Sequence, residues 1–199
     1  MSYLSIDLDY WMDYRRPKSA TEFFKKVFAA DVPLTVVMDH DELIASVNSK
    51  NFEHLINMDR HSDLSETPSQ KLTVGNWVNY VDWRTEGAFT WLRPPRSGLE
   101  YGRCHGLHDP FKKKQYCEWG LARISKDRRI INWDTVEHIG VSLSPDWVQM
   151  NSILDVCFQL VSRKPEFKSI LKRASTLEGR TYWRDDSTKS KIQALLKEL

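Results

Sequence analysis

Acidic and histidine residues alternate at three places in this chain, each directly after a short apolar run. The segments are Asp7-Leu8-Asp9, Asp39-His40-Asp41-Glu42 and Asp59-Arg60-His61-Ser62-Asp63. Residues i and i+2 of a strand point to the same face, so Asp7 and Asp9 would repel each other unless a positive group lay between them. A metal ion, a phosphate-transfer site or a solvated strand end could each resolve that repulsion.

The three segments together favour a metal site. Unpaired carboxylates at one place repel strongly, and Arg60 is the one Lys or Arg residue in these turns. Carboxylate and imidazole ligands without thiolate suit Mn²⁺, Fe²⁺ or Zn²⁺, and the excess of oxygen favours Mn²⁺. A lone Asp-x-Asp or a lone histidine is a weak signal, but alternating Asp, His and Asp after an apolar strand is hard to explain by packing. We therefore expect a binuclear site.

Four apolar runs predict the strands that would position these residues. They cover residues 3–8, 34–39, 54–59 and 138–143. Successive apolar positions are typical of strands covered on both faces. Residues 19–30 have Phe and Val at helical spacing, which predicts a βαβ unit and hence a parallel pair. Further helices are expected at 146–163, entered through Ser144-Pro145-Asp146, and at 187–199. The predicted fold class is α/β, with a three-layer, mostly parallel sheet flanked by helices.

The three acidic segments are expected to meet at one edge of this sheet. Carboxyl ends of parallel strands share one edge, where the ligand sites of open α/β folds are found. Segment 92–109 is rich in Pro, Gly and Arg, and we expect it to be irregular and to border the site.

Composition limits the other classes of function. A length of 199 residues suits a single domain, 1–199. The net charge of +2 gives no argument for a nucleic-acid partner, and the Lys112–Lys114 run is interpreted as a solvated loop. Cys104, Cys117 and Cys157 form no Cys-x-x-Cys pair, which fits a reducing compartment. Because no segment resembles a signal peptide or a membrane span, we expect a cytoplasmic protein without a membrane partner.

The motifs resemble those of the arginase, agmatinase and histone deacetylase superfamily. That superfamily binds metals at Gly-Gly-Asp-His-Ser, Asp-Ala-His-x-Asp and Ser-x-Asp-x-Asp strand ends, to which "MDHDE" (38–42), "DRHSD" (59–63) and "SIDLD" (5–9) are similar. The order of the motifs, the absent glycines before His40, Arg60 in place of alanine and the short chain differ from arginases. These differences resemble a small branch, the peptide arginases, which convert arginine side chains of ribosomally made precursor peptides to ornithine.

The resemblance implies a reduced arginase-like fold, a precursor peptide as substrate, and two Mn²⁺ ions. The implied ligands of the first ion are Asp7, His40, Asp59 and Asp63, and those that complete the second are Asp9 and His61. Asp59 and Asp7 would bridge the ions. Asp63 would also act in catalysis, because it would orient the attacking hydroxide and carry a proton to the leaving amine.

The residues that would hold the substrate are less constrained by these motifs. A guanidinium calls for a carboxylate, for which Glu42 is the first candidate, followed by Glu118 and Glu86. Asn76 and Trp77, in "GNWVNYVDW" (75–83), are candidate pocket residues, although aromatic residues at this density also pack cores.

Three alternatives stay open. A haloacid-dehalogenase-type phosphatase would take its nucleophile from "SIDLDYW", but it leaves "DRHSD" unexplained, and "WRDDS" (183–187) is the only acidic doublet near the C-terminus. A zinc-dependent deacetylase of the same fold would need one metal with an Asp, His, Asp set. A non-catalytic peptide-binding module would retain the metal for stability.

Overall fold

A six-stranded parallel sheet forms the centre of the structure, a computed structural model that describes residues 1–11, 18–64, 71–82, 89–94, 122–145, 148, 150–176 and 186–198. The strands are β1 (Ser2–Asp7), β2 (Leu34–Val37), β3 (His54–Met58), β4 (Phe89–Leu92), β5 (Ala122–Ser125) and β6 (Val136–Ser142). Their order across the sheet is β2-β6-β1-β3-β4-β5. Because every neighbouring pair is parallel, all the carboxyl ends lie at one edge.

The four predicted strands form, and β1 lies between β3 and β6. Ile6 of β1 is paired with Met58 on one side and with Val141 on the other. Sequence reasoning missed β4 and β5. Each is only four residues long, and polar residues such as Thr90 and Arg123 interrupt its apolar character.

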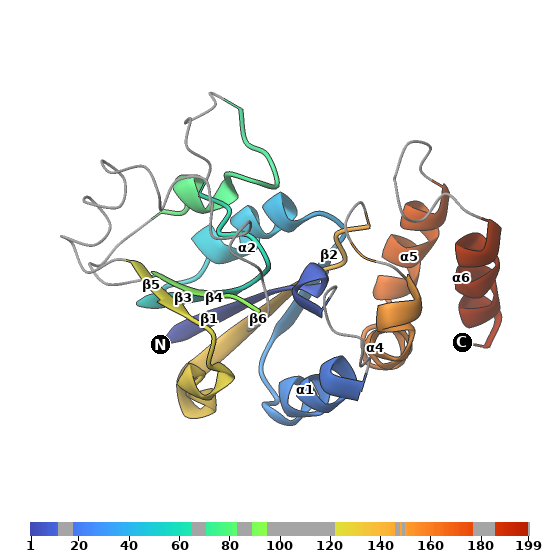
Figure 1. Ribbon diagram of the computed structural model, residues 1–199, viewed down its shortest axis with the longest axis horizontal. Coiled ribbons are helices and arrows are strands. Elements are labelled where there is room, and N and C mark those ends of the chain that lie inside the picture. The colour runs from blue at the N-terminus through green and yellow to red at the C-terminus, as the bar shows by residue number, and fades with distance from the viewer. Residues whose placement is uncertain are drawn as a thin grey trace.

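Helices cover both faces of the sheet (Figure 1). On one face α1 (Lys18–Ala29) packs against α4 (Met150–Arg163), and α5 (Phe167–Thr176) and α6 (Asp186–Glu198) pack beside α4. The opposite face carries the short helix α2 (Ile44–Asn48) and the 3-10 turn η3 (Trp77–Tyr80). The helices predicted at 19–30, 146–163 and 187–199 correspond to α1, α4 and α6. The predicted three-layer α/β fold is confirmed.

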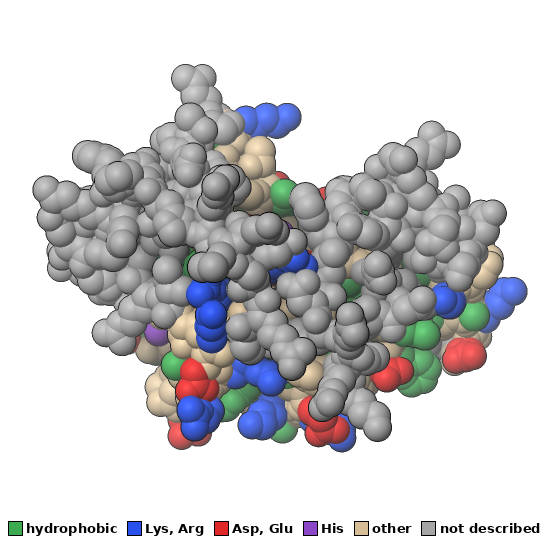
Figure 2. Space-filling model, in the orientation of Figure 1, with side chains coloured by type: hydrophobic (Ala, Val, Ile, Leu, Met, Phe, Trp, Pro, Cys, Tyr) green, Lys and Arg blue, Asp and Glu red, His purple; other side chains and the backbone are tan. Residues whose placement is uncertain are grey.

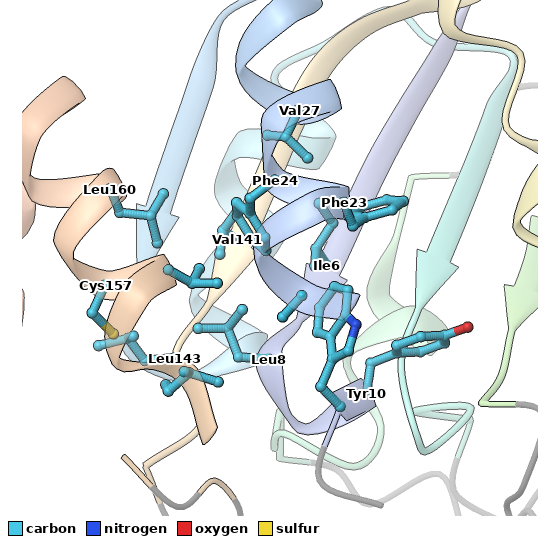
Figure 3. Close-up of a cluster of buried hydrophobic side chains, with 14 of the residues drawn as sticks. Ile6, Leu8, Tyr10, Phe23, Phe24, Val27, Val141, Leu143, Cys157 and Leu160 are labelled. Carbon is cyan, nitrogen blue, oxygen red and sulfur yellow. The ribbon is translucent and has the colours of Figure 1, made fainter. Parts of the chain in front are cut away.

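The side of β1 that carries Leu4 and Ile6 is its apolar face. There the two residues join the core that α1 and α4 complete, with Phe24 of α1 and Leu160 of α4 among its fully buried members. Figure 3 shows these helices closing over the strands, with Cys157 pointing into the same cluster. Burial raises the pKa of the Cys157 thiol, so this cysteine behaves as a core residue.

The side of β1 that carries Tyr3, Ser5 and Asp7 is its polar face. Tyr3 packs with Leu43, Val47 and other apolar residues of η2 (His40–Leu43), α2 and η3. Ser5 and Asp7 follow it toward the carboxyl edge and are also buried. The polar face is therefore covered by a second hydrophobic core, and charged side chains are buried beside that core at the carboxyl edge of the sheet.

Charges of both signs are present on the surface. In the coloured part of Figure 2, Lys and Arg side chains lie among Asp and Glu side chains along the lower side, in keeping with the net charge of +2. None of the helices in the described ranges has the length and apolar character needed to cross a membrane. Cys104, Cys117, the Lys112–Lys114 run and residues 95–109 of the predicted border segment lie outside the described residues.

Candidate metal centre

His40 faces three carboxylates at the carboxyl edge of the sheet. Its Nδ1 atom lies 3.2 Å from Asp7 Oδ2, 3.1 Å from Asp59 Oδ2 and 2.9 Å from Asp63 Oδ2. None of the four residues is more than 5% exposed. These four residues are called the His40 site below.

His61 faces the neighbouring carboxylates. Its Nδ1 atom lies 3.1 Å from Asp9 Oδ2 and 3.9 Å from Asp59 Oδ1. Asp59 thus turns one oxygen toward each histidine. The Asp9 side chain is buried, whereas the His61 side chain is 40% exposed, so His61 forms the solvent-facing side of the centre. His61, Asp9 and Asp59 are called the His61 site below.

The donor atoms of both sites fit divalent cations. Ligands about 2.1 Å from an ion, on adjacent corners of an octahedron, lie about 3.0 Å apart, and the distances from His40 Nδ1 to its three carboxylates are close to that value. A single ring nitrogen cannot satisfy three carboxylates by hydrogen bonding. Within the described residues, His40 Nδ1 and Asp9 Oδ2 are buried atoms without a hydrogen-bond partner, and one belongs to each site.

The ligands lie at or just beyond the strand ends. β1 ends at Asp7, and the 3-10 turn η1 (Leu8–Trp11), rather than strand alternation, places Asp9. His40 begins η2, and two residues separate it from the end of β2. Asp63 follows β3 and has a left-handed backbone with φ of 52°, a conformation that Asp tolerates better than most residues. Short turns therefore bring the ligands together over the edge of the sheet.

Serine hydroxyl groups contact two of the ligands, His40 and Asp7. Ser5 Oγ lies 2.7 Å from His40 Nε2, and when Nδ1 binds a cation, Nε2 carries the proton and donates to this oxygen. Ser144 Oγ donates to Asp7 Oδ2 at 2.5 Å and lies 2.8 Å from Ser142 Oγ. Sequence reasoning used Ser144 only as a helix start. The available signal was the alternation of Ser142 and Ser144 at the end of β6.

Asp59 and Asp63 are held by buried amide and indole groups. Asp59 Oδ2 accepts from Asn57 Nδ2 at 3.4 Å, and Asp59 Oδ1 accepts from the backbone N–H of His61 at 2.8 Å. Trp91 Nε1 donates to the backbone carbonyl of Asp59 at 3.0 Å. The Asp63 carboxylate accepts from Trp77 Nε1 at 2.6 Å.

Burial and mutual repulsion raise the pKa values of the site carboxyls. For Asp7 the causes are burial and then the charge of Asp9. Burial and the charge of Asp59 raise the pKa of Asp9 to about 6. Burial and the charges of Asp63 and Asp7 raise the pKa of Asp59 to about 7. The clustered carboxylates thus need positive charge nearby in order to be ionised together.

The carboxylates raise the pKa values of both histidines. Burial lowers the pKa of His40, but the charge of Asp63 and the close contacts of the ring with the site carboxylates outweigh it and hold this pKa well above the ordinary value. Burial also lowers the pKa of His61, and the close contact with the charged Asp9 raises it overall to about 10. Both imidazoles therefore supply positive charge that a cation could replace.

The structure brings the six predicted metal ligands together at one edge. It differs from the implied arrangement at Asp7, which was expected to bridge two ions. Asp7 Oδ1 instead accepts the backbone N–H of Asp9 at 2.9 Å. Among the described residues, only Asp59 belongs to both groups that could hold an ion.

Two of the predicted substrate residues support the centre from inside the core. Trp77 is fully buried and donates to Asp63, so it forms no part of an open pocket. Asn76 is 1% exposed. Its side chain accepts from the backbone N–H of Thr73 at 2.8 Å and donates to the carbonyl of Lys71 at 3.0 Å, which closes the turn that leads into η3.

Glu42, the predicted guanidinium anchor, binds a guanidinium of its own chain. Arg173 Nη2 of α5 donates to Glu42 Oε1 at 2.6 Å. The other oxygen of Glu42 accepts the backbone N–H groups of Met38 and Asp39, and the arginine together with these backbone donors lowers the pKa of Glu42 against the effect of its partial burial. The alternatives Glu86 and Glu118 lie outside the described residues.

Comparison with known proteins assigns no family to this chain. No protein-family model matches the sequence, and neither the curated proteins nor the solved structures give a significant match. Function is therefore inferred from the geometry of the two sites and from the motifs that supply their ligands.

Proposed function

We propose that the protein is a binuclear manganese hydrolase that converts arginine side chains of a precursor peptide to ornithine and releases urea. The observation that carries this proposal is the position of Asp59. Its Oδ2 faces His40 and its Oδ1 faces His61, which is the placement of a carboxylate shared by two ions. The order and spacing of the six ligands, similar to those of peptide arginases, support the same reading.

The ligand set supports manganese. Four carboxylates and two imidazoles, with no thiolate, are hard and borderline ligands of the kind that suit Mn²⁺. When bound, two such ions supply a nucleophilic water of lowered pKa and polarise the carbon under attack, which a guanidinium needs because its carbon is a poor electrophile.

Asp63 is the proposed proton carrier. Its carboxylate lies in the His40 site, and Trp77 fixes one of its oxygens. In the proposed reaction Asp63 takes the proton from the attacking water and passes it to the departing side-chain nitrogen. The carbon–nitrogen bond breaks, the peptide retains an ornithine amine, and the guanidinium carbon leaves as urea.

The exposure of His61 supports a peptide as the substrate. His61 is the one predicted ligand with a substantially exposed side chain, at 40%, whereas the others are buried. An arginine side chain can therefore approach the centre from the side of His61 while the peptide backbone stays outside.

The alternatives make different demands on the same atoms. A phosphatase would need Asp7 as a free nucleophile, but both oxygens of Asp7 accept hydrogen bonds, one from Asp9 and one from Ser144. A one-metal deacetylase would not need an acidic residue shared with a second histidine. A binding module would hold metal without turnover.

The decisive experiment combines elemental analysis with a peptide assay. The purified protein is loaded with Mn²⁺ and incubated with an arginine-containing peptide, with free arginine or with an acetyl-lysine peptide, and the products are read by mass spectrometry. Loss of the mass of cyanamide from the peptide, together with urea in solution, is expected. Chelator and Asp59→Asn should abolish it, and Asp134→Asn, at an exposed acid, should not. Preference for free arginine or for acetyl-lysine would overturn the proposal.

A further inference from the structure

We infer that Trp77 is a positioning residue of the His40 site, where it holds Asp63 and His40 in the arrangement that a cation requires. The inference rests on the metal centre of the proposed function, but not on the identity of its substrate. Trp77 is not itself a ligand, because an indole N–H can only donate.

One side chain contacts both ligands. Trp77 Nε1 donates to Asp63 Oδ2 at 2.6 Å, and this oxygen is the one that lies 2.9 Å from His40 Nδ1. The indole also lies against the His40 ring, with 4.9 Å between ring centroids and 49° between the ring planes. Trp77 therefore fixes the relative position of a nitrogen ligand and an oxygen ligand of one site.

Asp63 depends on this contact more than the other acids do. The side chains of Asp7, Asp9 and Asp59 each accept a backbone N–H, from residues 9, 60 and 61. Asp63 lies on a left-handed backbone beyond the end of β3. Within the described residues, its carboxylate has the indole of Trp77 and the ring of His40 as its partners. Without the indole, the Asp63 carboxylate would be free to rotate away from the cation.

The indole is itself held rigidly. Trp77 is 0% exposed and packs with Tyr3, Leu43 and Val47 on the polar face. The turn that leads into it is closed by the two hydrogen bonds of the Asn76 side chain. Because the indole cannot move, its N–H leaves the Asp63 carboxylate little rotational freedom. A residue that orients a metal ligand needs this rigidity.

Trp77→Phe tests the inference, because it keeps an aromatic ring in the core and removes the N–H. Trp133→Phe is the matched control, since it also replaces an indole by a phenyl ring, at a partly buried tryptophan that packs against the apolar core beside Phe23. Mn²⁺ binding to each protein is measured by calorimetry. Loss of a partner of a metal ligand typically weakens metal affinity by about 10–100-fold. We expect that loss for one of two ions in Trp77→Phe, and wild-type affinity for both ions in Trp133→Phe.

A spectroscopic measurement separates positioning from general loss of stability. The chain has eight tryptophans, and labelling with 5-fluorotryptophan gives each a fluorine signal. The signals of Trp77 and Trp133 are identified by their absence in the Phe variants. Addition of Zn²⁺, a diamagnetic probe, should shift the Trp77 signal more than the Trp133 signal. If Trp77→Phe does not fold, Trp77→Met, which also lacks a donor, serves in both measurements.

Each outcome decides the matter. Wild-type affinity for both ions in Trp77→Phe would overturn the inference, as would equal weakening of both ions in both Phe variants. A wild-type protein that binds two ions but leaves arginine peptides unchanged would contradict the proposed function and leave the role of Trp77 intact. A wild-type protein that binds no divalent cation would overturn both.

Discussion

The two faces of β1 differ in what their buried residues do. On the apolar face, Leu4 and Ile6 add only hydrocarbon to the core beneath α1 and α4. On the polar face, Ser5 and Asp7 are just as buried, but Ser5 contacts His40 and Asp7 stands among other charged groups. Within the six residues of β1, strand alternation thus places side chains that only pack the core on one face and side chains of the metal centre on the other.

The difference predicts where stability and function separate. Burial of apolar side chains stabilises a fold by roughly 1.5–3 kcal/mol for each large residue, whereas clustered buried carboxylates destabilise it unless a cation compensates them. We therefore expect changes on the apolar face to alter folding and not metal binding, and changes on the polar face to do the reverse.

The largest effect is expected from Asp59→Asn on the polar face. Because Asp59 is shared by both sites, its loss should release both ions and lower kcat by at least about 10⁴-fold, or ~5.5 kcal/mol. The metal-free variant should nevertheless be as stable as metal-free wild type, since one of four crowded carboxylates is gone. Urea unfolding in chelator measures this. A variant less stable than wild type by more than about 1 kcal/mol would contradict the division between the faces.

Phe24→Ala on the apolar face should have the opposite pattern. Phe24 is fully buried and lies against the rings of Trp11, Phe23 and Phe28. The cavity left by the substitution should lower the free energy of unfolding by about 3–5 kcal/mol. Mn²⁺ stoichiometry and affinity, measured on the folded fraction, should stay at wild-type values. Loss of metal binding without loss of stability would mean that the two faces are not independent.

Mn²⁺ addition should stabilise the wild type, and more so at higher pH. At 100 times the Kd, a ligand that binds only the folded state adds ~2.7 kcal/mol. Between 3.8 and about 7, the folded Asp59 carboxyl holds a proton that the unfolded one has lost, so stability of the metal-free protein falls as pH rises through this range. The gain on adding Mn²⁺, from urea unfolding, should therefore be larger at pH 8 than at pH 6 and absent in Asp59→Asn. A gain that is larger at pH 6 would contradict these site pKa values.

The fold and the ligand set could be predicted because both follow from local patterns. Doubly apolar runs identified four strands, and the rule that parallel strands end at one edge brought Asp7, His40 and Asp59 together. The same rule was less reliable for Asp9. Its position depends on a 3-10 turn that begins immediately after β1, and strand alternation does not describe such a turn.

The support of the site could not be predicted, because its contacts join residues far apart in the sequence. Ser144 is 137 residues from Asp7, to which it donates. Trp77 was interpreted as a pocket residue because sequence cannot distinguish an indole that faces a ligand from one that faces a substrate. Glu42 was predicted to bind the guanidinium of a substrate. In the structure it binds the guanidinium of Arg173, which lies on α5, a helix that was not predicted from the sequence.

The smallest change in stability is expected at His138. This residue lies on the polar face, at the end away from His40. His40 lies among carboxylates at the carboxyl edge, whereas His138 of β6 stacks on Tyr3, with 5.0 Å between ring centroids, and its Nε2 lies 2.8 Å from Thr35 Oγ1. Burial, with the charges of Lys50 and Lys164, lowers the pKa of His138 to about 4. The shift is opposite in direction to that of His40, because burial and the two lysine charges disfavour the charged imidazole of His138, whereas the charge of Asp63 favours that of His40.

The lowered pKa of His138 predicts a pH dependence of stability opposite to that of Asp59. Between pH 4 and 6.5 the unfolded chain binds a proton at residue 138 that the folded chain does not, so His138 makes stability fall as pH falls, the reverse of the effect of Asp59. His138→Gln keeps a polar group near Thr35 and removes this titration. In chelator, the difference between the unfolding free energies at pH 7 and pH 5 should shift by about 1 kcal/mol, with the variant relatively more stable at pH 5. Parallel profiles of unfolding free energy against pH for the two proteins would show that folding does not lower the pKa of His138. The pKa values of His40 and His138 would then not be shifted in opposite directions.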